Sequence, residues 1–219
     1  MPVDFYMMPG SAPCRGVALT AKALGVPLVE HQTDLMKGEH MTPAYLKMNP
    51  QHTIPTINDN GFSLWESRAI QQYLADKYGK NDDLYPKDAA KRAVVHQRLY
   101  FDMGTLYLRF GEIYYPMMFG GAPKDAEKVK KFDEALGFLD GFLSESKWAA
   151  GDKLTIADHS LVASISTADA VGHDLSKFPN IVRWYAECKK TMVGYEEANA
   201  AGAKGFGDWF NSVVKGLNS

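Results

Sequence analysis

The stretch NPQHTIPTINDNGFSLWESRAI, residues 49–70, decides the fold of the first part of the chain. Two short apolar runs, 53–58 and 62–65, are separated by a turn that contains Asn60-Gly61. An Asn-Gly pair between apolar runs is a strong signal for a tight antiparallel hairpin. From Ser67 onward, apolar residues recur at helical spacing. The stretch therefore predicts a hairpin that leads directly into a helix.

The residues before this stretch predict a parallel unit of two strands and a helix. Residues 3–7 form an apolar run that Pro9-Gly10 ends, which is typical of a buried strand. Helical spacing follows Ser11 until Gly25, and residues 27–32 favour a second strand. With a short helix expected around 43–47, the predicted order of this α/β domain is βαβαββα.

The residues after the hairpin and its helix predict no further strand. Residues 80–87 are rich in turn formers and poor in apolar residues, so we interpret them as a linker. One long helical pattern covers 88–115, and apolar residues at near-heptad spacing follow in 129–143. We therefore predict an α/β domain over 1–79 and an all-helical domain over 88–219.

The end of the chain supplies three more helix signals. Thr155-Ile156-Ala157-Asp158 matches a capping box, in which a hydroxyl and a carboxylate satisfy opposing amides of a helix start. Residues 178–191 and 204–214 also follow the helical period. We interpret the capping box as structural rather than catalytic.

Composition excludes several classes of protein. The 219 residues carry a formal net charge of −2, which gives no basic surface for nucleic acid or an anionic membrane. No apolar run approaches the ~20 residues of a membrane helix, and the first residues lack the cationic start of a secretory signal. The histidines show no zinc-like spacing, so we expect no metal site, and we expect a cytoplasmic protein.

The first candidate for chemistry is Ser11, in SAPCR. A strand, a Pro-Gly turn and a helix that begins near Pro13 place Ser11 beside free backbone amides, which stabilise an anion. A serine hydroxyl there can donate a hydrogen bond to a thiolate. The alternative is that Ser11 only caps the helix.

Two further segments could recognise a peptide. In residues 49–56, a cis Ile54-Pro55 bond would present the backbone of Ile54, and His52 could bind a carboxylate; the alternative is an ordinary loop. At the next helix start, Glu66 could hold an amine while Ser67 and the amides hold a carboxylate. The alternative there is a plain helix cap with two solvated charges.

The combination resembles the serine-type cytosolic glutathione transferases, closest to the insect delta and epsilon classes. SAPCR, NPQHTIPT, LWESRAI, RFGEIYYP and LTIADHS occur in the expected order over nearly the whole chain. The resemblance implies a thioredoxin-like N-terminal domain with a cis Pro55, an all-helical C-terminal domain and a homodimer. It also implies glutathione as co-substrate, no tightly bound cofactor, and conjugation to hydrophobic electrophiles, as in detoxification.

The resemblance also implies roles for single residues. Ser11 would stabilise the glutathione thiolate, and Ile54 would pair with the cysteinyl backbone. His40 and His52 would reach the glycyl carboxylate. The γ-glutamyl end would be held by Glu66, Ser67 and Arg68, and Thr53 and Pro55 would also contact glutathione.

Aromatic residues and methionines mark a candidate electrophile site between the domains. They cluster at the end of the long helix and in the C-terminal tail, and methionine suits varied ligand shapes. The candidates are Tyr107, Phe110, Tyr114, Tyr115, Met118, Phe119, Phe206 and Phe210. We expect about half to belong to the core. Met117-Met118 stands where the resemblance leads us to expect a polar residue, which indicates an unusually apolar pocket.

Other interpretations remain open at this point. Cys14 could serve a thiol–disulfide oxidoreductase, although its place in the first helical turn favours a structural thiol. The chain could also be a binding protein without catalysis. Tyr6 could activate the thiol, but we predict it to be core, and we interpret Arg15 as a brace between domains. Peroxidase activity on organic hydroperoxides would use the same thiolate.

Overall fold

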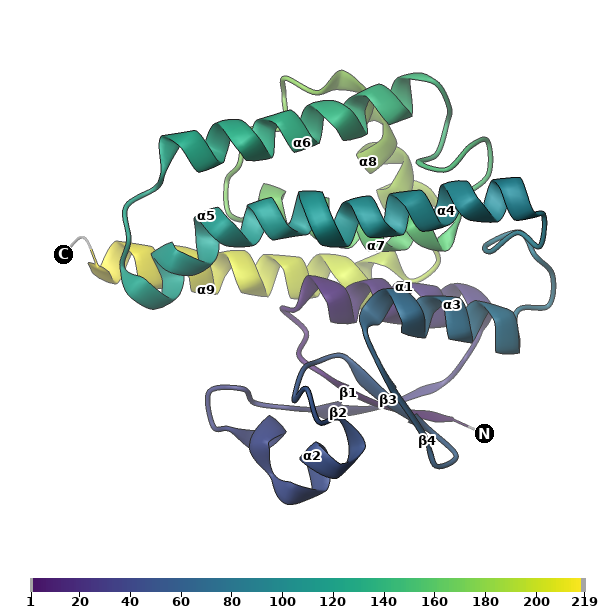
Figure 1. Cartoon of the computed structure of the whole chain (residues 1–219). Coiled ribbons are helices and arrows are strands. Elements are labelled where there is room, and N and C mark those ends of the chain that lie inside the picture. Colours follow the sequence, from purple (N-terminus) through teal and green to yellow (C-terminus); the bar gives the residue numbers. More distant parts are fainter. Residues whose placement is uncertain (1, 218–219) are drawn as a thin grey trace.

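A four-stranded mixed sheet organises the first domain. The computed structural model describes residues 2–217, and Figure 1 shows the sheet below the helical part of the molecule. The strand order is β2-β1-β3-β4, with β1 and β2 parallel and the other pairs antiparallel. The strands are β1 (Val3–Met7), β2 (Leu28–Gln32), β3 (Thr56–Asp59) and β4 (Phe62–Trp65). This is the predicted βαβ unit followed by a hairpin.

The hairpin turn has the geometry that Asn60-Gly61 predicts. Asp59 pairs with Phe62, so the loop contains only two residues. Both have positive φ, 54° at Asn60 and 90° at Gly61, as a turn that follows the twist of the strands requires. The amide of Gly61 donates to Oδ1 of Asn58 at 2.9 Å.

The two faces of the sheet are covered differently. Helices α1 (Ala12–Leu24) and α3 (Ser67–Tyr78) lie on one face, and the short α2 (Pro43–Met48) lies on the other (Figure 1). Alternate side chains of β1 are buried in the core with α1 and α3. Tyr6 has the opposite orientation: it stacks on His31, with 4.7 Å between ring centroids, and meets Tyr45 edge-on at 5.7 Å. Our prediction that Tyr6 belongs to the core was wrong, because side chains alternate between faces along a strand.

The second domain is helical throughout residues 89–217, apart from its connections and one isolated bridge between Trp148 and Gly151. No helix among residues 2–217 is both long and apolar enough to cross a membrane. The elements are α4 (Ala89–Phe101), η2 (Asp102–Leu106), α5 (Tyr107–Gly120), α6 (Ala126–Ser144), α7 (Ile156–Ala170), α8 (Pro179–Thr191), η3 (Glu196–Ala200) and α9 (Ala201–Leu217).

Two of these helices differ from the prediction. The pattern over 88–115 is one rod in space, but η2 is a π-helical turn within it. The helix also continues past Pro116 to Gly120, and Met118 in this extension is buried in the core. The last helix begins at Ala201, after η3, another π-helical turn. π-Turns have no periodic sequence signal and often occur at functional sites.

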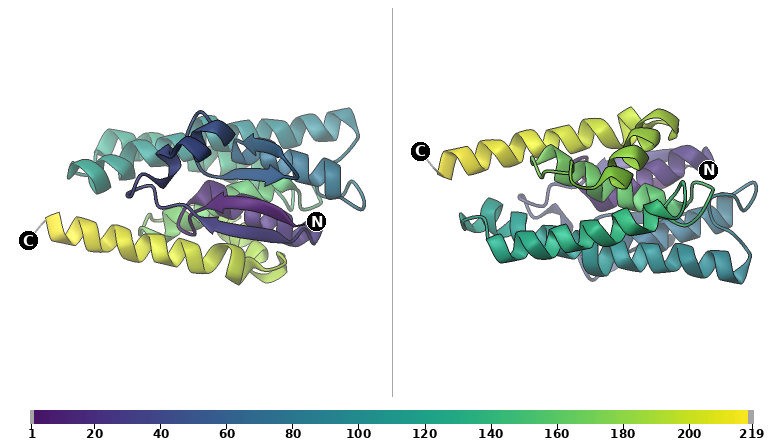
Figure 2. Two further views of the ribbon diagram at one scale, coloured as in Figure 1. Left: turned by 90° about the horizontal axis from the view of Figure 1, so that it is seen from below. Right: turned by 90° about the horizontal axis from the view of Figure 1, so that it is seen from above.

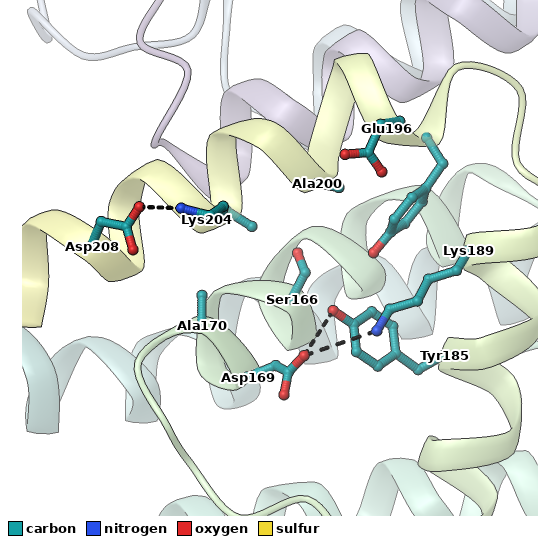
Figure 3. A pocket seen from close by; sticks show the side chains of 11 residues that line it. Ser166, Asp169, Ala170, Tyr185, Lys189, Glu196, Ala200, Lys204 and Asp208 are labelled. Atoms are coloured by element: carbon teal, nitrogen blue, oxygen red, sulfur yellow. Dashed lines mark hydrogen bonds and ion pairs between the residues drawn. The ribbon is translucent and has the colours of Figure 1, made fainter.

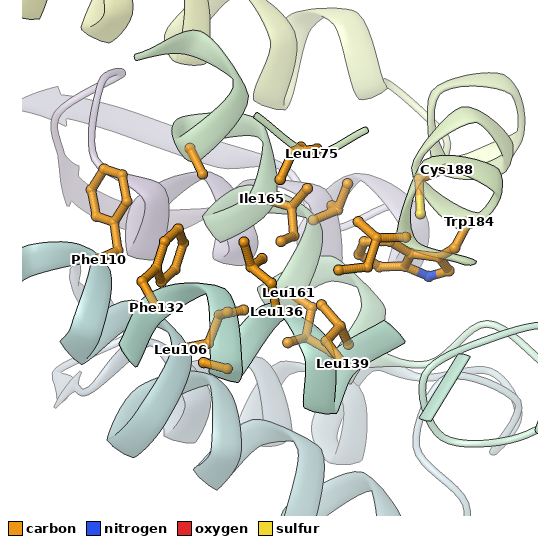
Figure 4. Packing of buried hydrophobic residues seen from close by; sticks show 14 of the residues in the cluster. Leu106, Phe110, Phe132, Leu136, Leu139, Leu161, Ile165, Leu175, Trp184 and Cys188 are labelled. Atoms are coloured by element: carbon orange, nitrogen blue, oxygen red, sulfur yellow. The ribbon is translucent and has the colours of Figure 1, made fainter. Parts of the chain in front are cut away.

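Helix α7 is the centre of the second domain. Figure 2 shows it enclosed by the other helices, and nearly all of its residues are buried. Leu161 and Ile165 on α7 meet Leu136 and Leu139 on α6 and Trp184 on α8, as Figure 4 shows. The core is thus built around one apolar helix.

Arg15 fastens the two domains together, which confirms its interpretation as a brace. Helix α1 packs along α7, and Arg15 is only 1% exposed. Its Nη1 donates to Ser166 Oγ at 2.9 Å and to Asn199 Oδ1 at 2.6 Å. Nη2 donates to the carbonyl of Ala163 at 3.3 Å and to the hydroxyl of Thr167. Burial lowers the pKa of Arg15 to about 10, so the guanidinium stays charged at neutral pH.

Candidate active site

Ser11 lies at the start of α1, but its hydroxyl does not cap the helix. It has extended backbone angles, φ −74° and ψ 116°, and makes no side-chain capping hydrogen bond. The first turn holds a proline and no acidic residue. Ser11 is thus the N-cap by position, without the side-chain hydrogen bond of a cap. The helix start keeps the positive end of its dipole and its free amides for an anion.

Cys14 is unsuited to redox chemistry, although it lies one turn from Ser11. Its thiol is fully buried. Burial raises the pKa of the Cys14 thiol to about 11; contacts with the Ser11 side chain and the Met8 backbone and the charge of Arg15 offset this rise only in part. Because the thiolate is the reactive form, a buried and protonated thiol disfavours the oxidoreductase alternative.

The loop before β3 is held rigidly by two side chains that we did not single out. Asn49 is 0% exposed, and its Nδ2 donates to the Thr53 carbonyl at 3.0 Å and to Thr56 Oγ1 at 2.9 Å. The hydroxyl of Tyr45 donates to the same Thr53 carbonyl at 2.7 Å. The position of Asn49 directly before Pro50 was the available signal, since Asn-Pro favours turns.

This loop presents the backbone that a peptide would meet. The Ile54-Pro55 bond is cis, as expected. The amide and carbonyl of Ile54 form no hydrogen bond with other residues of the described range 2–217. Pro55 is buried directly before β3, whereas Thr53, two residues earlier, is exposed. The loop therefore offers one free donor and one free acceptor.

His40 and His52 come together although they belong to different segments. Their ring centroids are 5.9 Å apart. His52 is exposed and has a positive φ of 47°, which turns it out of the loop. Nδ1 of His40 is buried without a hydrogen-bond partner. The two imidazoles thus form one polar patch beside the Ile54 backbone loop.

The start of α3 is a second open helix terminus. Glu66 is the N-cap, yet it makes no capping hydrogen bond, and its φ of 68° is unusual for a residue with a side chain. Its carboxylate is exposed, whereas Ser67 is 4% exposed. Strained backbone of this kind concentrates at functional sites. Glu66 and the free amides of α3 can receive an amine and a carboxylate.

Arg68 is engaged by the second domain rather than free in the site. Its Nη1 donates to Ser67 Oγ at 2.9 Å, and Nη2 forms an ion pair with Asp102. Asp102 is 0% exposed and accepts from Ser160 Oγ at 2.6 Å and from Ser164 Oγ at 2.7 Å. The structure thus favours a supporting role, and direct ligand contact by Arg68 stays a prediction. Sequence reasoning missed Asp102 because it lies in the π-turn.

The electrophile candidates separate into core and surface. Phe110, Tyr114, Met118 and Phe210 are buried in the core of the second domain. The others are partly buried or, in Phe119, 63% exposed. They are Tyr107, Tyr115, Phe119 and Phe206.

One contact within this aromatic surface holds it together, and one contact joins it to the first domain. The hydroxyls of Tyr107 and Tyr115 are 2.5 Å apart, in a hydrogen bond. On α9, Phe206 packs against Gly10, where an added Cβ would meet the Cβ of Phe206 at 3.5 Å. Phe206 therefore lies beside the turn that leads to Ser11, so the aromatic surface and the open start of α1 are neighbours.

Two family models match the chain. Residues 5–82 match the glutathione S-transferase N-terminal domain, and residues 90–190 match the glutathione S-transferase C-terminal domain. The chain belongs to the glutathione S-transferase family. Members of this family use glutathione as co-substrate and have no tightly bound cofactor. The thioredoxin-like domain followed by an all-helical domain is the architecture of this family.

Solved structures place the chain among the insect enzymes of this family. A delta-class glutathione transferase of Nilaparvata lugens is 60% identical over 97% of this chain and 100% of that chain, with a TM-score of 0.95. An epsilon-class glutathione S-transferase of Musca domestica is 42% identical over 96% and 97%, with a TM-score of 0.91. A glutathione transferase homologue of Drosophila mojavensis, solved with bound glutathione, is 35% identical over 97% of each chain, with a TM-score of 0.89.

Proposed function

We propose that this chain conjugates the thiolate of glutathione to hydrophobic electrophiles and that Ser11 stabilises the thiolate. The observation that carries the proposal is the open start of α1, where Ser11 stands at the N-cap without a capping hydrogen bond. The hydroxyl can therefore donate to a ligand sulfur while the helix dipole favours its negative charge. The glutathione bound to the Drosophila mojavensis homologue supports the choice of thiol.

The energetics of thiolate formation are sufficient without a base or a metal. A free cysteine thiol has a pKa of ~8.5, and lowering it by one unit requires about 1.4 kcal/mol. A hydrogen bond to an ion contributes roughly 1.5–3 kcal/mol, and a helix start roughly 0.3–1 kcal/mol. Together they lower the pKa by about one to three units, which gives substantial thiolate at neutral pH.

Each remaining part of the tripeptide has a matching polar group in the first domain. The backbone of Ile54, between Thr53 and Pro55, pairs with the cysteinyl residue. The glycyl carboxylate meets His40 and His52, whose rings lie 5.9 Å apart. The γ-glutamyl end lies at the start of α3, between Glu66 and Ser67, with Arg68 holding Ser67 in place.

The electrophile lies on the aromatic surface beside the turn at Gly10. Tyr107, Tyr115, Phe119 and Phe206 form this surface, and the four buried candidates support it from the core. The same thiolate would reduce organic hydroperoxides as a side activity. The proposal includes a homodimer acting in the cytoplasm, in detoxification.

The decisive experiment is conjugation of glutathione to 1-chloro-2,4-dinitrobenzene by the full chain, followed as kcat/KM between pH 5.5 and 9. Ser11→Ala removes the hydroxyl, and Cys14→Ser is the matched control in the same helical turn. We expect Ser11→Ala to lower kcat/KM at pH 6.5 by about 10- to 100-fold, with the apparent thiol pKa raised by one to two units. Cys14→Ser should keep the profile of the unmodified protein.

Two results would oppose the proposal in different ways. Glutathione binding without conjugation to any of several aryl and alkyl halides would support a binding protein. Activity that survives Ser11→Ala and disappears in Cys14→Ser would assign the chemistry to the buried thiol instead.

A further inference from the structure

Two cavities lie apart from the proposed active site, and they differ in how their polar groups are paired. Figure 3 shows the first, among α7, α8 and α9, where Lys204 pairs with Asp208. Lys189 pairs with Asp169 in the same cavity, so most charged groups there already have partners. The second cavity has a volume of about 490 Å³ and is lined by Lys22, Ala23, Leu24, Gly25, Lys80, Asn81, Asp83, Leu84, Leu154, His159, Thr191, Met192 and Val193.

The second cavity lies at the junction of the two domains, at the opposite end of α1 from Ser11. Helix α1 has 13 residues and is therefore about 20 Å long, so the two sites are separate. Apolar residues of both domains form the walls of the second cavity. Leu24 comes from α1 and Leu84 from the linker, whereas Leu154 and Met192 belong to the second domain. The walls therefore suit an apolar ligand.

His159, in the first turn of α7, is the buried polar group of the second cavity. Its side chain lines the cavity although the residue is only 1% exposed. Nδ1 lies 3.0 Å from Thr20 Oγ1. Nε2 has no hydrogen-bond partner within residues 2–217, and it is not fully closed off by protein. A buried polar atom without a partner is unfavourable, so a ligand that supplies a partner is favoured there.

The hydrogen bonds around Thr20 determine which ring nitrogen of His159 carries the proton. Thr20 Oγ1 donates its single proton to the Gly16 carbonyl at 3.0 Å. It also accepts from Gln71 Nε2 at 3.1 Å. Toward His159 it can therefore only accept, so Nδ1 carries the proton. Because burial lowers the pKa of His159 to about 3, the ring is neutral at pH 7. Nε2 is thus a hydrogen-bond acceptor that faces the second cavity.

The charged residues of the second cavity do not select a charged ligand. Lys22 pairs with Glu197 at 2.7 Å. Asp83 pairs with Lys153, also at 2.7 Å. Lys80 is exposed, and water and salt screen exposed charges. The ligand is therefore selected by the apolar walls and by the single acceptor among them.

We propose that the second cavity binds a small neutral hydroxyl compound with an apolar body, such as a phenol. The hydroxyl donates to Nε2 of His159, and the apolar body lies against Leu24, Leu84 and Met192. The ligand is bound without chemical change. This site goes beyond glutathione conjugation and does not depend on it.

The test is fluorescence titration of the full chain with 2-naphthol at pH 7, where the phenol is neutral. Saturating S-hexylglutathione occupies the proposed active site. The matched ligand is 2-methoxynaphthalene, which has the same rings but no hydroxyl donor. We expect 2-naphthol to bind about fivefold more tightly than the ether, although the ether is the more apolar of the two.

Two substitutions of His159 separate the acceptor from the rest of the ring. His159→Asn keeps an amide donor for Thr20 but leaves no acceptor at the position of Nε2. It should raise the Kd of 2-naphthol about fivefold and leave that of 2-methoxynaphthalene unchanged. His159→Gln can place an amide oxygen near the position of Nε2, so the Kd of 2-naphthol should stay within about twofold.

Two substitutions of exposed residues locate the ligand without changing the core. Val193 lines the second cavity and is 62% exposed. Val193→Trp should obstruct the cavity and weaken the binding of 2-naphthol and 2-methoxynaphthalene alike. Lys80→Ala is the matched control in the same cavity, and it should leave the Kd of both ligands unchanged, because neither is charged.

Several outcomes would overturn the assignment. Absence of binding up to the solubility limit of 2-naphthol would exclude the site. Equal affinity for 2-naphthol and 2-methoxynaphthalene would mean that Nε2 recognises no hydroxyl. Unchanged binding in both His159→Asn and Val193→Trp would place the ligand elsewhere. Binding that S-hexylglutathione abolishes would assign 2-naphthol to the active site, whereas failure of S-hexylglutathione itself to bind would contradict only the proposed function.

Discussion

The starts of helices α1 and α7 are built from similar residues and have opposite structures. Both have a hydroxyl residue at the N-cap, Ser11 in α1 and Thr155 in α7. Thr155 Oγ1 accepts from the Ala157 amide at 3.3 Å, and the Asp158 carboxylate accepts from the Thr155 amide at 2.9 Å. Ser11 makes no such bond, and no acidic residue follows in its first turn.

The difference separates a helix start that holds the fold together from one that is left for a ligand. Asp158 also accepts from the Ala149 amide at 2.8 Å and from Trp184 Nε1 at 2.9 Å, so one carboxylate joins three segments of the second domain. The Thr155 hydroxyl donates to the same carboxylate at 3.2 Å, so four donors are paired with it. At Ser11 the same kind of terminus keeps its donors free, which costs stability but supplies an anion site.

The largest expected effect comes from removing the carboxylate that caps the start of α7. Asp158→Ala leaves the amides of Ala149 and Thr155 and the Trp184 indole buried without an acceptor. Each such donor costs about 1–3 kcal/mol, so we expect a loss on the order of 4 kcal/mol in the free energy of unfolding. Urea unfolding measures it, with Asp152→Ala as an exposed control in the preceding turn. An equal midpoint in both variants would show that the capping box contributes nothing.

The reverse change adds a capping carboxylate to the uncapped start of α1. Ser11→Asp places a capping carboxylate at α1, where it satisfies the free amides and repels a thiolate. We expect kcat/KM for glutathione conjugation to fall more than about 100-fold, while the melting temperature stays equal or rises. Enzyme assays and thermal melts on one preparation measure both. Retained activity would mean that the start of α1 is not the thiolate site.

The stability of the α7 start should depend on pH through the neighbouring residue His159. His159 contacts Thr20 Oγ1 of α1 at 3.0 Å, and burial lowers its pKa to about 3. The unfolded chain takes up the proton near pH 6.5, so this contribution to stability is complete above pH 6.5 and is lost as pH falls toward 3.

At pH 5 this loss amounts to about 2 kcal/mol relative to pH 7. Unfolding free energies of the unmodified chain and of His159→Gln between pH 7 and 5 measure it. The variant should be less stable at pH 7 but should have a flatter slope. The slope that remains belongs in part to His173, whose pKa burial also lowers. An unchanged slope would refute the buried neutral state of His159.

The smallest effect is expected from Thr155→Ala, which removes one half of the capping box. The Asp158 carboxylate remains, so the loss should be about 1 kcal/mol in the free energy of unfolding. Conjugation per folded molecule should stay unchanged. Set beside Ser11→Ala, which should change conjugation and leave stability nearly unchanged, this pair of variants tests the comparison most directly. A loss of activity without a loss of stability in Thr155→Ala would contradict the assignment of the α7 start to stability and of the α1 start to catalysis.

The sequence predicted the elements well where a local signal exists. The Asn60-Gly61 hairpin, the helix stop at Gly25 and the capping box at Thr155 each follow from residues within a few positions of one another. The π-turns at 102–106 and 196–200 were missed, because their irregular backbone depends on packing and not on a sequence period. The turn at 102–106 places Asp102 against Arg68, so that contact was missed with it.

For the site, the sequence by itself determined which residues have suitable chemistry: Ser11 before a helix, Pro55 before a strand, and Glu66-Ser67 before the next helix. These are local patterns of side chain and backbone, which any fold must respect. Only the tertiary structure decided which groups are free. It left the Ser11 hydroxyl uncapped, committed Arg68 to Asp102, and buried Phe110 while leaving Phe119 exposed. The physical reason is that hydrogen-bond partners and burial come from segments distant in the chain, and no local pattern specifies them.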